Sequence, residues 1–505
     1  MGDDAPIMGA SSLSAWQARA RAIRFPAQAF IGGRYVDAAS GATFESVNPA
    51  TGKVLAKVAS GDAQDIDRAV AAARSAFRRG SWARMPPVQR KRVMQRFAEL
   101  VLQHREELAL LETLDMGKPI GDSLGVDIPA ATRCIHWYAE AIDKVYDEIA
   151  PAGPDALALV TREPMGVIGA IVPWNFPLVM AAWKIGPALA AGNSLVLKPS
   201  EKSPFTAIRV AQLAAEAGIP EGVLNVVPGF GHTAGKALAL HMDVDGIAFT
   251  GSTATGGLVM KYAGESNLKR VSLECGGKSP NIVLADYEDL DRAAQAAASA
   301  IFFNQGEMCS AGSRLLVQEG IRDALLEKVQ AIGRSMRPGD PLDPATRVGA
   351  MVDEIQMKRV LGYIDAGKRD GATVRFGGRR VREESGGYFV EPTLFEGVQP
   401  GMRIAREEIF GPVLSVITFR TVEEAIEIAN DVVYGLAAAI WTRDVTTAHR
   451  AARALRAGGV YVNCYDADDI TVPFGGFKQS GFGRDKSLHA FHKYTELKTT
   501  WLDLS

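Results

Sequence analysis

The sequence has little cysteine and no long apolar run. Cys134, Cys275, Cys309 and Cys464 are widely separated, and none belongs to a CxxC pair or to a His spacing that suits zinc. Scattered cysteines argue against a disulfide framework and fit a reducing compartment. No apolar run approaches the roughly 18 residues that a membrane-spanning helix needs. We therefore expect neither a metal site nor a membrane segment.

An excess of either charge is also missing. The chain has 56 Lys and Arg residues against 58 Asp and Glu residues, which gives a formal net charge of −2. A balanced charge provides no electrostatic attraction for nucleic acid or for an anionic membrane. Residues 12–25 are Arg-rich and amphipathic, as in a transit peptide, but Asp3, Asp4 and the absence of serine enrichment argue against one. We expect a surface helix there and a cytoplasmic protein.

What the sequence does contain is a long α/β pattern. At 505 residues the chain exceeds one core, so two large domains and a smaller element are expected. From residue 167 onward, β-type runs alternate with helical runs, which indicates right-handed βαβ units and a mostly parallel sheet. A second α/β series runs from residue 281 to about 462. The strands expected in the first series are 167–172, 194–197, 223–227, 247–250 and 270–273, and the helices are 177–190, 203–217, 232–241 and 253–263.

The two ends of the chain have different patterns. Short strands at 30–36 and 44–47 precede a helical region at 63–150, whose apolar stripes indicate core packing. The tail, residues 494–504, is strand-like and needs a partner sheet to bury its apolar side. Parallel sheets bind ligands at the carboxyl ends of their strands, so the first series is predicted to be a nucleotide-binding domain.

Cys309 lies on a loop between two predicted elements. An Ala-rich helical run at 291–300 ends in a turn around Asn304 and Gly306, and a β-type run begins at Arg314. A thiol in this place can be both fixed and accessible, although a lone cysteine is commonly a small buried hydrophobe. A nucleophile would also need a base, an oxyanion site and an electron acceptor or leaving group.

Polar residues follow several of the predicted strands. Asn175, in PWNFP, could direct its amide at a developing oxyanion, or form an Asx turn or N-cap. Lys198 and Glu201, in KPSE, suit ribose hydroxyls, or form a solvated charge pair. The run FTGSTATG at 249–256 could present backbone N–H groups to a pyrophosphate, although Gly/Ser turns are common. Glu274, in LECGGK, is a candidate general base, or a surface residue in a turn.

These segments follow one another as PWNFP, KPSE, FTGSxxxG, LECGGKSP, FFNQGxxCxAGSR, EEIFGPV and PFGGFKQSG. Together they resemble the aldehyde dehydrogenase superfamily along nearly the whole chain. The resemblance implies an α/β fold with a Rossmann-like parallel-sheet cofactor domain, a second α/β catalytic domain and a small β oligomerisation element. The implied boundaries are 1–145 and 167–276 for NAD binding, 146–166 and 485–505 for oligomerisation, and 277–484 for catalysis.

The resemblance also implies roles for residues at matching positions. Cys309 matches the nucleophile, Glu274 the base that activates water, and Asn175 the oxyanion donor that acts with the Cys309 backbone N–H. Lys184 matches a lysine linked to proton relay from the base. The implied cofactor contacts are Trp174, Lys198, Glu201, Gly231, Ser252, Glu408 and Phe410. The implied substrate contacts are Trp183, Asp469 and Phe474.

In the implied mechanism, the Cys309 thiolate adds to the aldehyde carbon and Asn175 stabilises the oxyanion. Hydride then passes to the nicotinamide, which leaves a thioester on Cys309. Glu274 deprotonates the water that releases the carboxylate. NAD is the expected cofactor, with NADP weaker, because the Glu201 carboxylate would repel a 2′-phosphate.

Two residues depart from the pattern. Glu307 stands where many relatives have Gln, and an ionised carboxylate facing the thiolate would raise the thiol pKa and slow attack. We expect Glu307 to point away from the thiolate or to be paired. Cys275 replaces a commoner Leu or Ala beside the base, and we expect it to fill the core, although a thiol there could oxidise.

Other functions fit the sequence less well than NAD-dependent aldehyde oxidation. A CoA-acylating dehydrogenase is disfavoured because that branch of the superfamily lacks the base at the Glu274 position. A non-catalytic protein on the same fold is disfavoured because the nucleophile, the base and the oxyanion amide are all present. A hydrolase with a His base is disfavoured because none of the 7 His residues lies in a recognisable motif.

The stretches at 127–129, 136–144, 468–474 and 483–489 resemble bacterial ω-aminoaldehyde dehydrogenases, including those for γ-glutamyl-γ-aminobutyraldehyde and 4-guanidinobutyraldehyde. This resemblance implies an ω-amino- or guanidino-aldehyde substrate and a role in polyamine catabolism. Asp469 would pair with the substrate's cationic end at the mouth of the aldehyde tunnel. A broad-specificity aliphatic or betaine-type enzyme is the alternative. Relatives are dimers or tetramers, so a homo-oligomer such as a homotetramer is expected.

Overall fold

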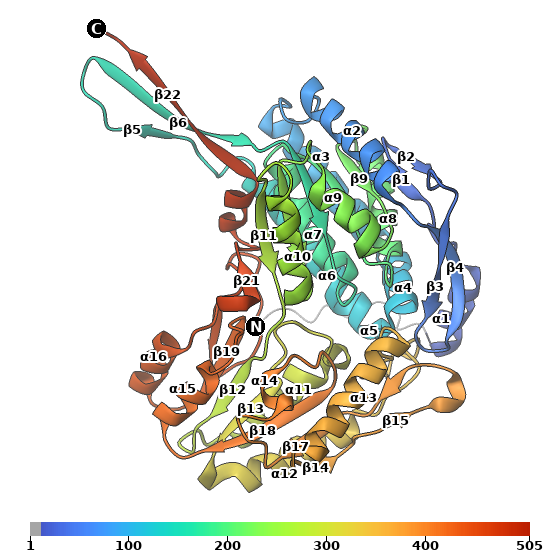
Figure 1. Cartoon of the computed structure of the whole chain (residues 1–505), viewed down its shortest axis with the longest axis vertical. Helices are drawn as coiled ribbons and strands as arrows, with labels where there is room; N and C mark the ends of the chain where they lie inside the picture. Colours follow the sequence, from blue (N-terminus) through green and yellow to red (C-terminus); the bar gives the residue numbers. More distant parts are fainter. Residues whose placement is uncertain (1–11) are drawn as a thin grey trace.

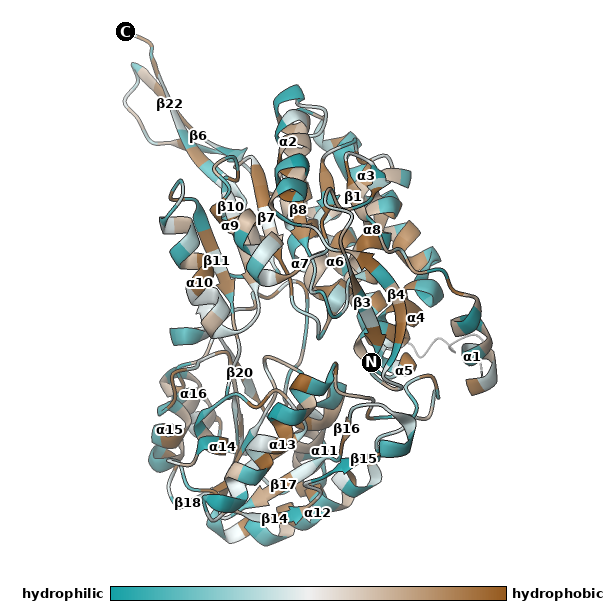
Figure 2. Ribbon diagram, turned by 45° about the vertical axis from the view of Figure 1, so that its right-hand side comes forward, coloured by the Kyte–Doolittle hydropathy of each residue, from teal (hydrophilic) through white to brown (hydrophobic). Residues whose placement is uncertain are grey.

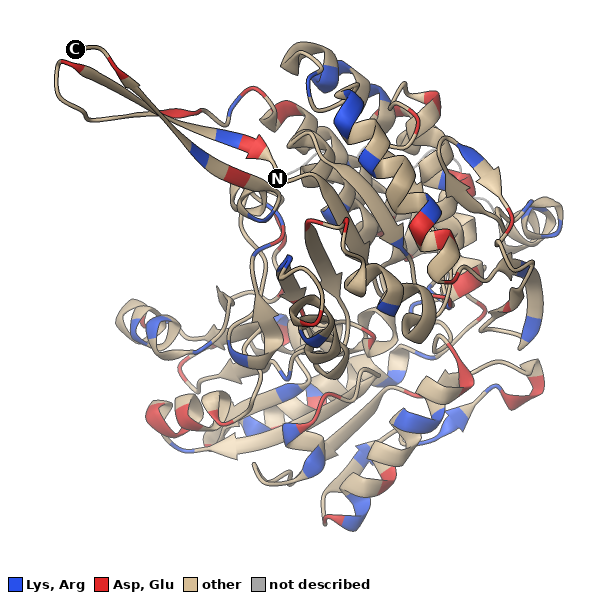
Figure 3. Ribbon diagram, turned by 45° about the horizontal axis from the view of Figure 1, so that its top comes forward, with Lys and Arg blue, Asp and Glu red and all other residues tan. Residues whose placement is uncertain are grey.

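The computed structural model of the protein describes residues 12–505 and shows two lobes with a projecting arm (Figure 1). The part of the expected first domain that precedes residue 12 lies outside the described residues. The helix predicted near 12–25 is α1 (Leu13–Ala22), which begins at a Ser12 cap and buries Trp16. Acidic and basic residues are interspersed over both lobes (Figure 3). Across residues 12–505, no helix is both long enough and apolar enough to cross a bilayer.

The first lobe is built on an eight-stranded sheet with the order β2-β1-β9-β8-β7-β10-β11-β21. Its centre, from β9 to β11, is parallel, and β1, β2 and β21 are antiparallel additions. Every residue of β7, β8 and β10 is buried, as expected for apolar strands with helices on both faces (Figure 2). The strands are β1 (Ala29–Ile31), β2 (Arg34–Val36), β7 (Val167–Ile171), β8 (Ser194–Lys198), β9 (Leu224–Val226), β10 (Gly246–Thr250), β11 (Arg270–Glu274) and β21 (Gly481–Phe482).

The strands and helices predicted between residues 167 and 276 are confirmed. The predicted helix at 232–241 begins as a π-helical turn, Gly231–Gly235, before α9. The strand predicted at 44–47 is β3 (Thr43–Asn48), which pairs with β4 (Lys53–Ala59), a strand that was not predicted, and the single strand predicted at 30–36 is the antiparallel pair of β1 and β2. The helices of this lobe are α2 (Ala63–Arg79), α3 (Pro87–Gln103), α4 (Arg105–Met116), α5 (Ile120–Asp122), α6 (Ile128–Ala141), α7 (Pro177–Ala190), α8 (Phe205–Glu216), α9 (Lys236–Leu240) and α10 (Thr253–Gly264).

Two buried carboxylates on α4 hold the helices that follow β7 and β8. Glu112 accepts a hydrogen bond from the Leu178 N–H at 3.3 Å, and Asp115 accepts one from the Phe205 N–H at 3.2 Å. Both donors belong to the first turn of a helix, where N–H groups have no partner within the helix. These contacts fix the start of α7, the helix that carries Trp183 and Lys184.

The second lobe contains a seven-stranded sheet with the order β14-β17-β18-β13-β12-β19-β20, parallel except at β14. This sheet confirms the second α/β series. Its strands are β12 (Pro280–Val283), β13 (Arg314–Gln318), β14 (Thr373–Phe376), β17 (Thr393–Glu396), β18 (Val413–Phe419), β19 (Ala437–Trp441) and β20 (Gly459–Val462). The helices are α11 (Leu290–Phe302), α12 (Arg322–Ser335), α13 (Glu354–Arg369), α14 (Arg403–Arg406), α15 (Val422–Asn430) and α16 (Val445–Ala454), and a two-stranded sheet joins β15 (Arg380–Val381) to β16 (Phe389–Val390).

The arm is a three-stranded antiparallel sheet that projects from the lobes (Figure 1). The strand predicted at the tail is confirmed as β22 (Thr495–Asp503), which pairs with β6 (Ala156–Pro164), and β5 (Glu148–Ala150) adds the third strand. Leu497 and Trp501 on β22 stay 65% and 64% exposed. Pairing with β6 satisfies the backbone groups on one edge of β22, and within the described residues its other edge and these apolar side chains stay uncovered.

Candidate active site

A cavity of about 290 Å³ is lined by residues of both lobes. Its polar residues stand at the carboxyl ends of β7, β10 and β11, which meet at one edge of the first sheet. The Cys309 loop and the segment around Glu408 close the cavity from the second lobe. The sequence-predicted residues that line it are Trp174, Asn175, Ser252, Glu274, Cys309, Glu408 and Phe410.

The loop that bears Cys309 is held in an unusual backbone conformation. After α11, Asn304 and Gln305 have φ values of 48° and 56°, in the left-handed region that residues with a Cβ rarely adopt. The Asn304 side-chain amide offsets this strain by donating to the carbonyls of Asn175, at 3.0 Å, and Glu307, at 3.1 Å. The turn thus ties the Cys309 loop to the segment that follows β7.

Asn175 is buried and oriented by the same loop. Its side-chain Nδ2 donates to the Glu307 carbonyl at 2.8 Å. A primary amide carries two N–H groups, and this bond uses one of them. The other is the kind of donor that can stabilise an oxyanion formed next to Cys309.

Burial and negative neighbours shape the electrostatics of the cavity. Burial, reinforced by Glu274, Asp466 and Glu408, raises the pKa of the Cys309 thiol well above its ordinary value. Burial also raises the pKa of Glu274 to about 8, although nearby lysines oppose the shift. Across the described residues, Glu274 Oε1 has no hydrogen-bond partner. A carboxyl group with this pKa can exchange a proton near neutral pH, as a general base must.

The two glycines after Glu274 allow two groups to approach closely. A Cβ on Gly276 would overlap the Glu408 carboxylate, and a Cβ on Gly277 would lie 2.7 Å from the Cys309 carbonyl oxygen. The Gly277 N–H donates to Glu408 Oε1 at 3.2 Å. Burial raises the pKa of Glu408 to about 7. The LECGGK segment therefore brings the Glu408 carboxylate and the nucleophile loop to the end of β11.

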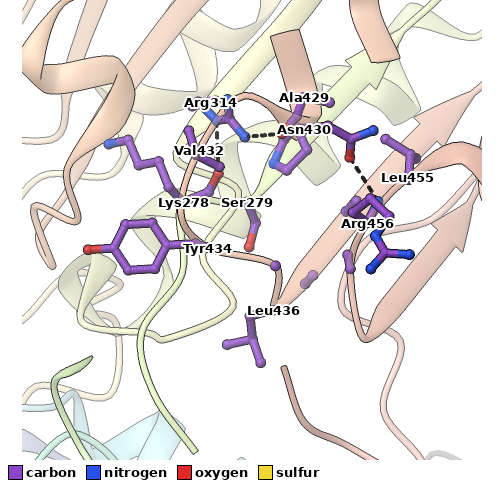
Figure 4. Close-up of a pocket in the computed structure, with 15 residues that line it drawn as sticks. Lys278, Ser279, Arg314, Ala429, Asn430, Val432, Tyr434, Leu436, Leu455 and Arg456 are labelled. Carbon is purple, nitrogen blue, oxygen red and sulfur yellow. Dashed lines mark hydrogen bonds between the residues drawn. The ribbon is translucent and has the colours of Figure 1, made fainter. Parts of the chain in front are cut away.

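Arg314 is hydrogen-bonded to the backbone of this segment at Lys278 (Figure 4). Its buried guanidinium donates to the carbonyls of Lys278 at 2.8 Å, Ile428 at 2.9 Å and Ala429 at 2.8 Å. The adjacent cavity measures only about 10 Å³, which is room for about one water molecule. Burial lowers the pKa of the Lys278 amino group beside it to about 7. This cavity is too small for a substrate, so its contacts position the backbone beneath the site.

A buried ion-pair cluster lies behind Glu274. Lys184 Nζ donates to Asp485 Oδ2 at 2.5 Å, and Lys493 donates to the other oxygen of the same carboxylate. The side chains of Lys184 and Asp485 are both 1% exposed. Sequence reasoning identified Lys184 but gave no role to Asp485 or Lys493. Asp485 and Lys493 come close to Glu274 because the chain returns to the first sheet at β21, beside β11. No local sequence pattern predicts this return.

Glu307 and Cys275 are placed as expected. The Glu307 carboxylate, fully buried, accepts a hydrogen bond from the Val352 N–H at 3.1 Å, and burial raises its pKa well above the ordinary value. This bond directs the Glu307 carboxylate toward the Val352 backbone, and the charged groups that raise the pKa of the Cys309 thiol are Glu274, Asp466 and Glu408. Cys275 is 3% exposed and belongs to a hydrophobic cluster of the first lobe.

The predicted dinucleotide contacts spread along the edge of the first sheet. Lys198, Glu201 and Gly231 lie outside the cavity lining, at the ends of β8 and β9. Lys198 Nζ lies 3.4 Å from Glu201 Oε2, and a Cβ on Gly231 would meet nothing within 4 Å. Ser252 caps α10 and accepts a hydrogen bond from the Thr255 N–H at 3.2 Å. The open backbone at Gly231 and the N-terminus of α10 suit a pyrophosphate, and the Glu201 carboxylate suits ribose hydroxyls. Together these features suit a dinucleotide such as NAD.

Trp183 and Phe474 form an aromatic wall with ring centroids 5.2 Å apart. The Lys486 ammonium lies 5.8 Å and 5.9 Å from the two ring centroids and pairs with Asp468. Sequence reasoning missed Lys486. The Lys486 backbone has a φ of 61°, in the left-handed region, and a lysine in the sequence does not predict this conformation.

The three carboxylates of the loop at 465–469 have different partners. Asp466 accepts a hydrogen bond at 3.0 Å from the hydroxyl of Ser310, the residue after Cys309. Asp468 pairs with Lys486. Asp469 is exposed and accepts hydrogen bonds from Thr471, which lower its pKa and keep it ionised. Burial raises the pKa of Asp466 and Lys486 neutralises Asp468, so the negative charge of the loop is concentrated on Asp469 at the surface.

Known proteins resemble this chain over nearly its whole length. Residues 35–500 match the aldehyde dehydrogenase family. The NADP/NAD-dependent aldehyde dehydrogenase PuuC of Escherichia coli (strain K12) is 54% identical over 492 residues, covering 97% of this chain and 99% of that protein.

Solved structures agree closely with this one. The γ-glutamyl-γ-aminobutyraldehyde dehydrogenase of Burkholderia cenocepacia J2315 is 62% identical with a TM-score of 0.97, covering 98% of this chain and 100% of that chain. A variant of P. syringae AldA, an indole-3-acetaldehyde dehydrogenase bound to NAD+ and IAA, is 64% identical with a TM-score of 0.97 and covers 98% and 100%. The fold implied by the sequence motifs is confirmed.

Proposed function

The chain belongs to the aldehyde dehydrogenase family and carries out NAD(P)-dependent aldehyde oxidation, and we propose that its substrates are ω-amino or guanidino aldehydes. The observation that carries this proposal is the acidic loop at 465–469, which starts beside the nucleophile through the Asp466–Ser310 hydrogen bond. A substrate whose aldehyde is at Cys309 could extend its cationic end along this loop. The B. cenocepacia relative is named for a γ-glutamylated aminoaldehyde, whose far end carries an ammonium as well as a carboxylate.

We propose that Cys309 is the nucleophile, that the Asn175 amide and the Cys309 backbone N–H stabilise the oxyanion, and that Glu274 activates the hydrolytic water. Lys184 relays the proton taken up by the base. The residues that would hold NAD are Trp174, Lys198, Glu201, Gly231, Ser252, Glu408 and Phe410. NAD supplies the hydride acceptor when bound. The thioester that remains on Cys309 is then hydrolysed to the carboxylate.

Asp469 is the residue of the acidic loop that we propose as the partner of the substrate's cation. Asp469→Asn should lower kcat/KM for 4-guanidinobutyraldehyde by roughly threefold to tenfold, because an exposed carboxylate contributes less than a desolvated one. The same variant should leave an uncharged aliphatic aldehyde of equal length unchanged. Steady-state kinetics with both substrates measures the difference.

Asp503→Asn is the matched control, because the exposed Asp503 on the arm accepts the same pair of hydrogen bonds, from the N–H and the hydroxyl of Ser505, that Asp469 accepts from Thr471. It should change the preference for a charged substrate less than Asp469→Asn does. Equal losses with charged and uncharged aldehydes in Asp469→Asn would contradict its assigned role. A wild-type preference for the uncharged aldehyde would contradict the proposed substrate class.

An uncharged aromatic or aliphatic aldehyde is the second candidate. The aromatic wall of Trp183 and Phe474 favours it, and the P. syringae relative is an indole-3-acetaldehyde dehydrogenase. A betaine-type aldehyde is a further alternative with a cationic end. A panel that contains 4-aminobutyraldehyde, 4-guanidinobutyraldehyde, betaine aldehyde, indole-3-acetaldehyde and pentanal separates these classes by kcat/KM.

Cofactor preference provides a separate prediction. Glu201 is proposed to lie near the adenosine 2′ position, where a carboxylate accepts a hydrogen bond from a hydroxyl and repels a phosphate. NAD should therefore have the higher kcat/KM, and Glu201→Gln should raise the relative efficiency of NADP roughly tenfold. Steady-state titration with both cofactors tests this. Equal wild-type efficiency with NADP would show that Lys198 compensates for the carboxylate.

We also propose that the arm, residues 146–166 with 485–505, assembles the chain into a homo-oligomer such as a dimer or tetramer. The exposed Leu497 and Trp501 support this, because uncovered apolar side chains on a paired strand favour a partner surface. Residues 1–145 and 167–276 are proposed as the NAD-binding domain and 277–484 as the catalytic domain.

A further inference from the structure

Lys493 forms part of the buried cluster behind Glu274 and has no assigned role. It ends a short 3-10 helix (Leu488–Lys493), and its side chain is 8% exposed. Its ammonium pairs with Asp485 Oδ1, while Lys184 holds Oδ2 of the same carboxylate. Asp485 is fixed in turn, because its backbone N–H and C=O both pair with Phe474 at 2.8 Å.

The cluster balances its charge only when both lysines are present. Ionised Glu274 and Asp485 contribute two negative charges, which Lys184 and Lys493 neutralise. Without Lys493, ionisation of Glu274 would leave a net negative charge in a buried site, which is strongly unfavourable. Asp485 would remain ionised because Lys184 still holds it at 2.5 Å.

The other groups that face the cluster do not replace Lys493. Arg484 also acts on Glu274, but its effect is smaller than those of Lys184 and Lys493. Lys493 itself lies 5.3 Å from the Tyr494 ring centroid. The remaining titratable neighbours are Cys275 and Cys309 beside Glu274, and Cys134, Tyr138 and Tyr494 beside Asp485.

We propose that Lys493 is a positioning residue for the general base: through Asp485 and its own charge, it favours the ionised form of Glu274 that is needed for hydrolysis of the thioester. The inference rests on the role proposed above for Glu274. Burial lowers the pKa of Lys493 to about 8, which matches the value of about 8 for Glu274.

The test compares Lys493→Met, which keeps the length of the side chain and removes the charge, with Lys493→Arg, which keeps the charge. In Lys493→Met, the pH at which steady-state turnover is half of its maximum should rise by about one unit. Turnover at pH 7 should therefore fall roughly tenfold and recover at alkaline pH. The rate of the NADH burst should not change. Lys493→Arg should restore most of the wild-type profile. Lys328→Met removes an exposed lysine paired with Asp291 and should have no effect.

A purely structural role for Lys493 predicts a different result. A structural role would lower turnover equally at all pH values, reduce Tm and slow the NADH burst. Any of these results, with the pH of half-maximal turnover unchanged, would overturn the proposal. If Lys493→Met does not fold, the Lys493→Arg and Lys493→Gln profiles decide the question. Wild-type turnover in Glu274→Gln would instead refute the role of the base, and this outcome is separate from a failure of Lys493.

Discussion

Replacing Cys309 with alanine should abolish NADH formation with every aldehyde, a loss of at least about a thousandfold in kcat. Without the thiol, no covalent adduct forms, and the oxyanion donors have no tetrahedral intermediate to stabilise. The variant should still bind NAD, because the cofactor contacts proposed above are other side chains. Stopped-flow absorbance of NADH measures the first turnover, and quenching of Trp fluorescence measures cofactor binding.

Cys134→Ala is the matched control for this loss. Cys134 is buried in the core of the first lobe, with its Sγ 3.4 Å from the Ala182 carbonyl oxygen, and it lies outside the cavity lining. Its replacement should cost stability and preserve the burst. An NADH burst equal to the concentration of active sites in Cys309→Ala would show that another group is the nucleophile.

The pH dependence of the burst follows from the state of the thiol. Burial holds the pKa of Cys309 well above its ordinary value, so the thiol is protonated at neutral pH. The thiolate is the attacking species, and its fraction rises with pH. The wild-type burst rate should therefore increase with pH across the neutral range.

Much of the site could be predicted because it is assembled from the ends of parallel strands. Asn175 follows β7, a continuous apolar run (VIGAI), and Glu274 ends β11, where apolar and polar residues alternate (RVSLE). The carboxyl ends of neighbouring parallel strands meet at one edge, so separate local signals combine into one cavity.

The parts that the sequence did not indicate depend on contacts between distant segments. Asp485 and Lys493 reach Lys184 only because β21 adds to the edge of the first sheet next to β11. The direction of Glu307 depends on the left-handed turn at Asn304. Such a turn is expected from the sequence mainly where glycine occurs, so Asn304 does not predict it. Such features follow from tertiary packing, which has no periodic signature along the chain.

Glu274→Gln should separate the two halves of the reaction. The variant should release one NADH per active site in a burst, followed by steady-state turnover reduced by roughly 10²–10⁴-fold. Cys309 can still form the thioester, but no carboxylate remains to deprotonate the hydrolytic water. In the wild type, turnover should rise with pH through about 8, because the ionised form of Glu274 is active and its pKa is raised to that value. This limb should be absent from the variant.

Hydroxylamine provides the decisive control for Glu274→Gln. It attacks a thioester without help from a general base, so it should restore turnover in the variant and have little effect on Cys309→Ala. Loss of the burst in Glu274→Gln, with NAD binding intact, would mean that Glu274 also deprotonates Cys309 in the first step. That result would place both proton transfers on one carboxyl group, that of Glu274, which lines the cavity together with Cys309.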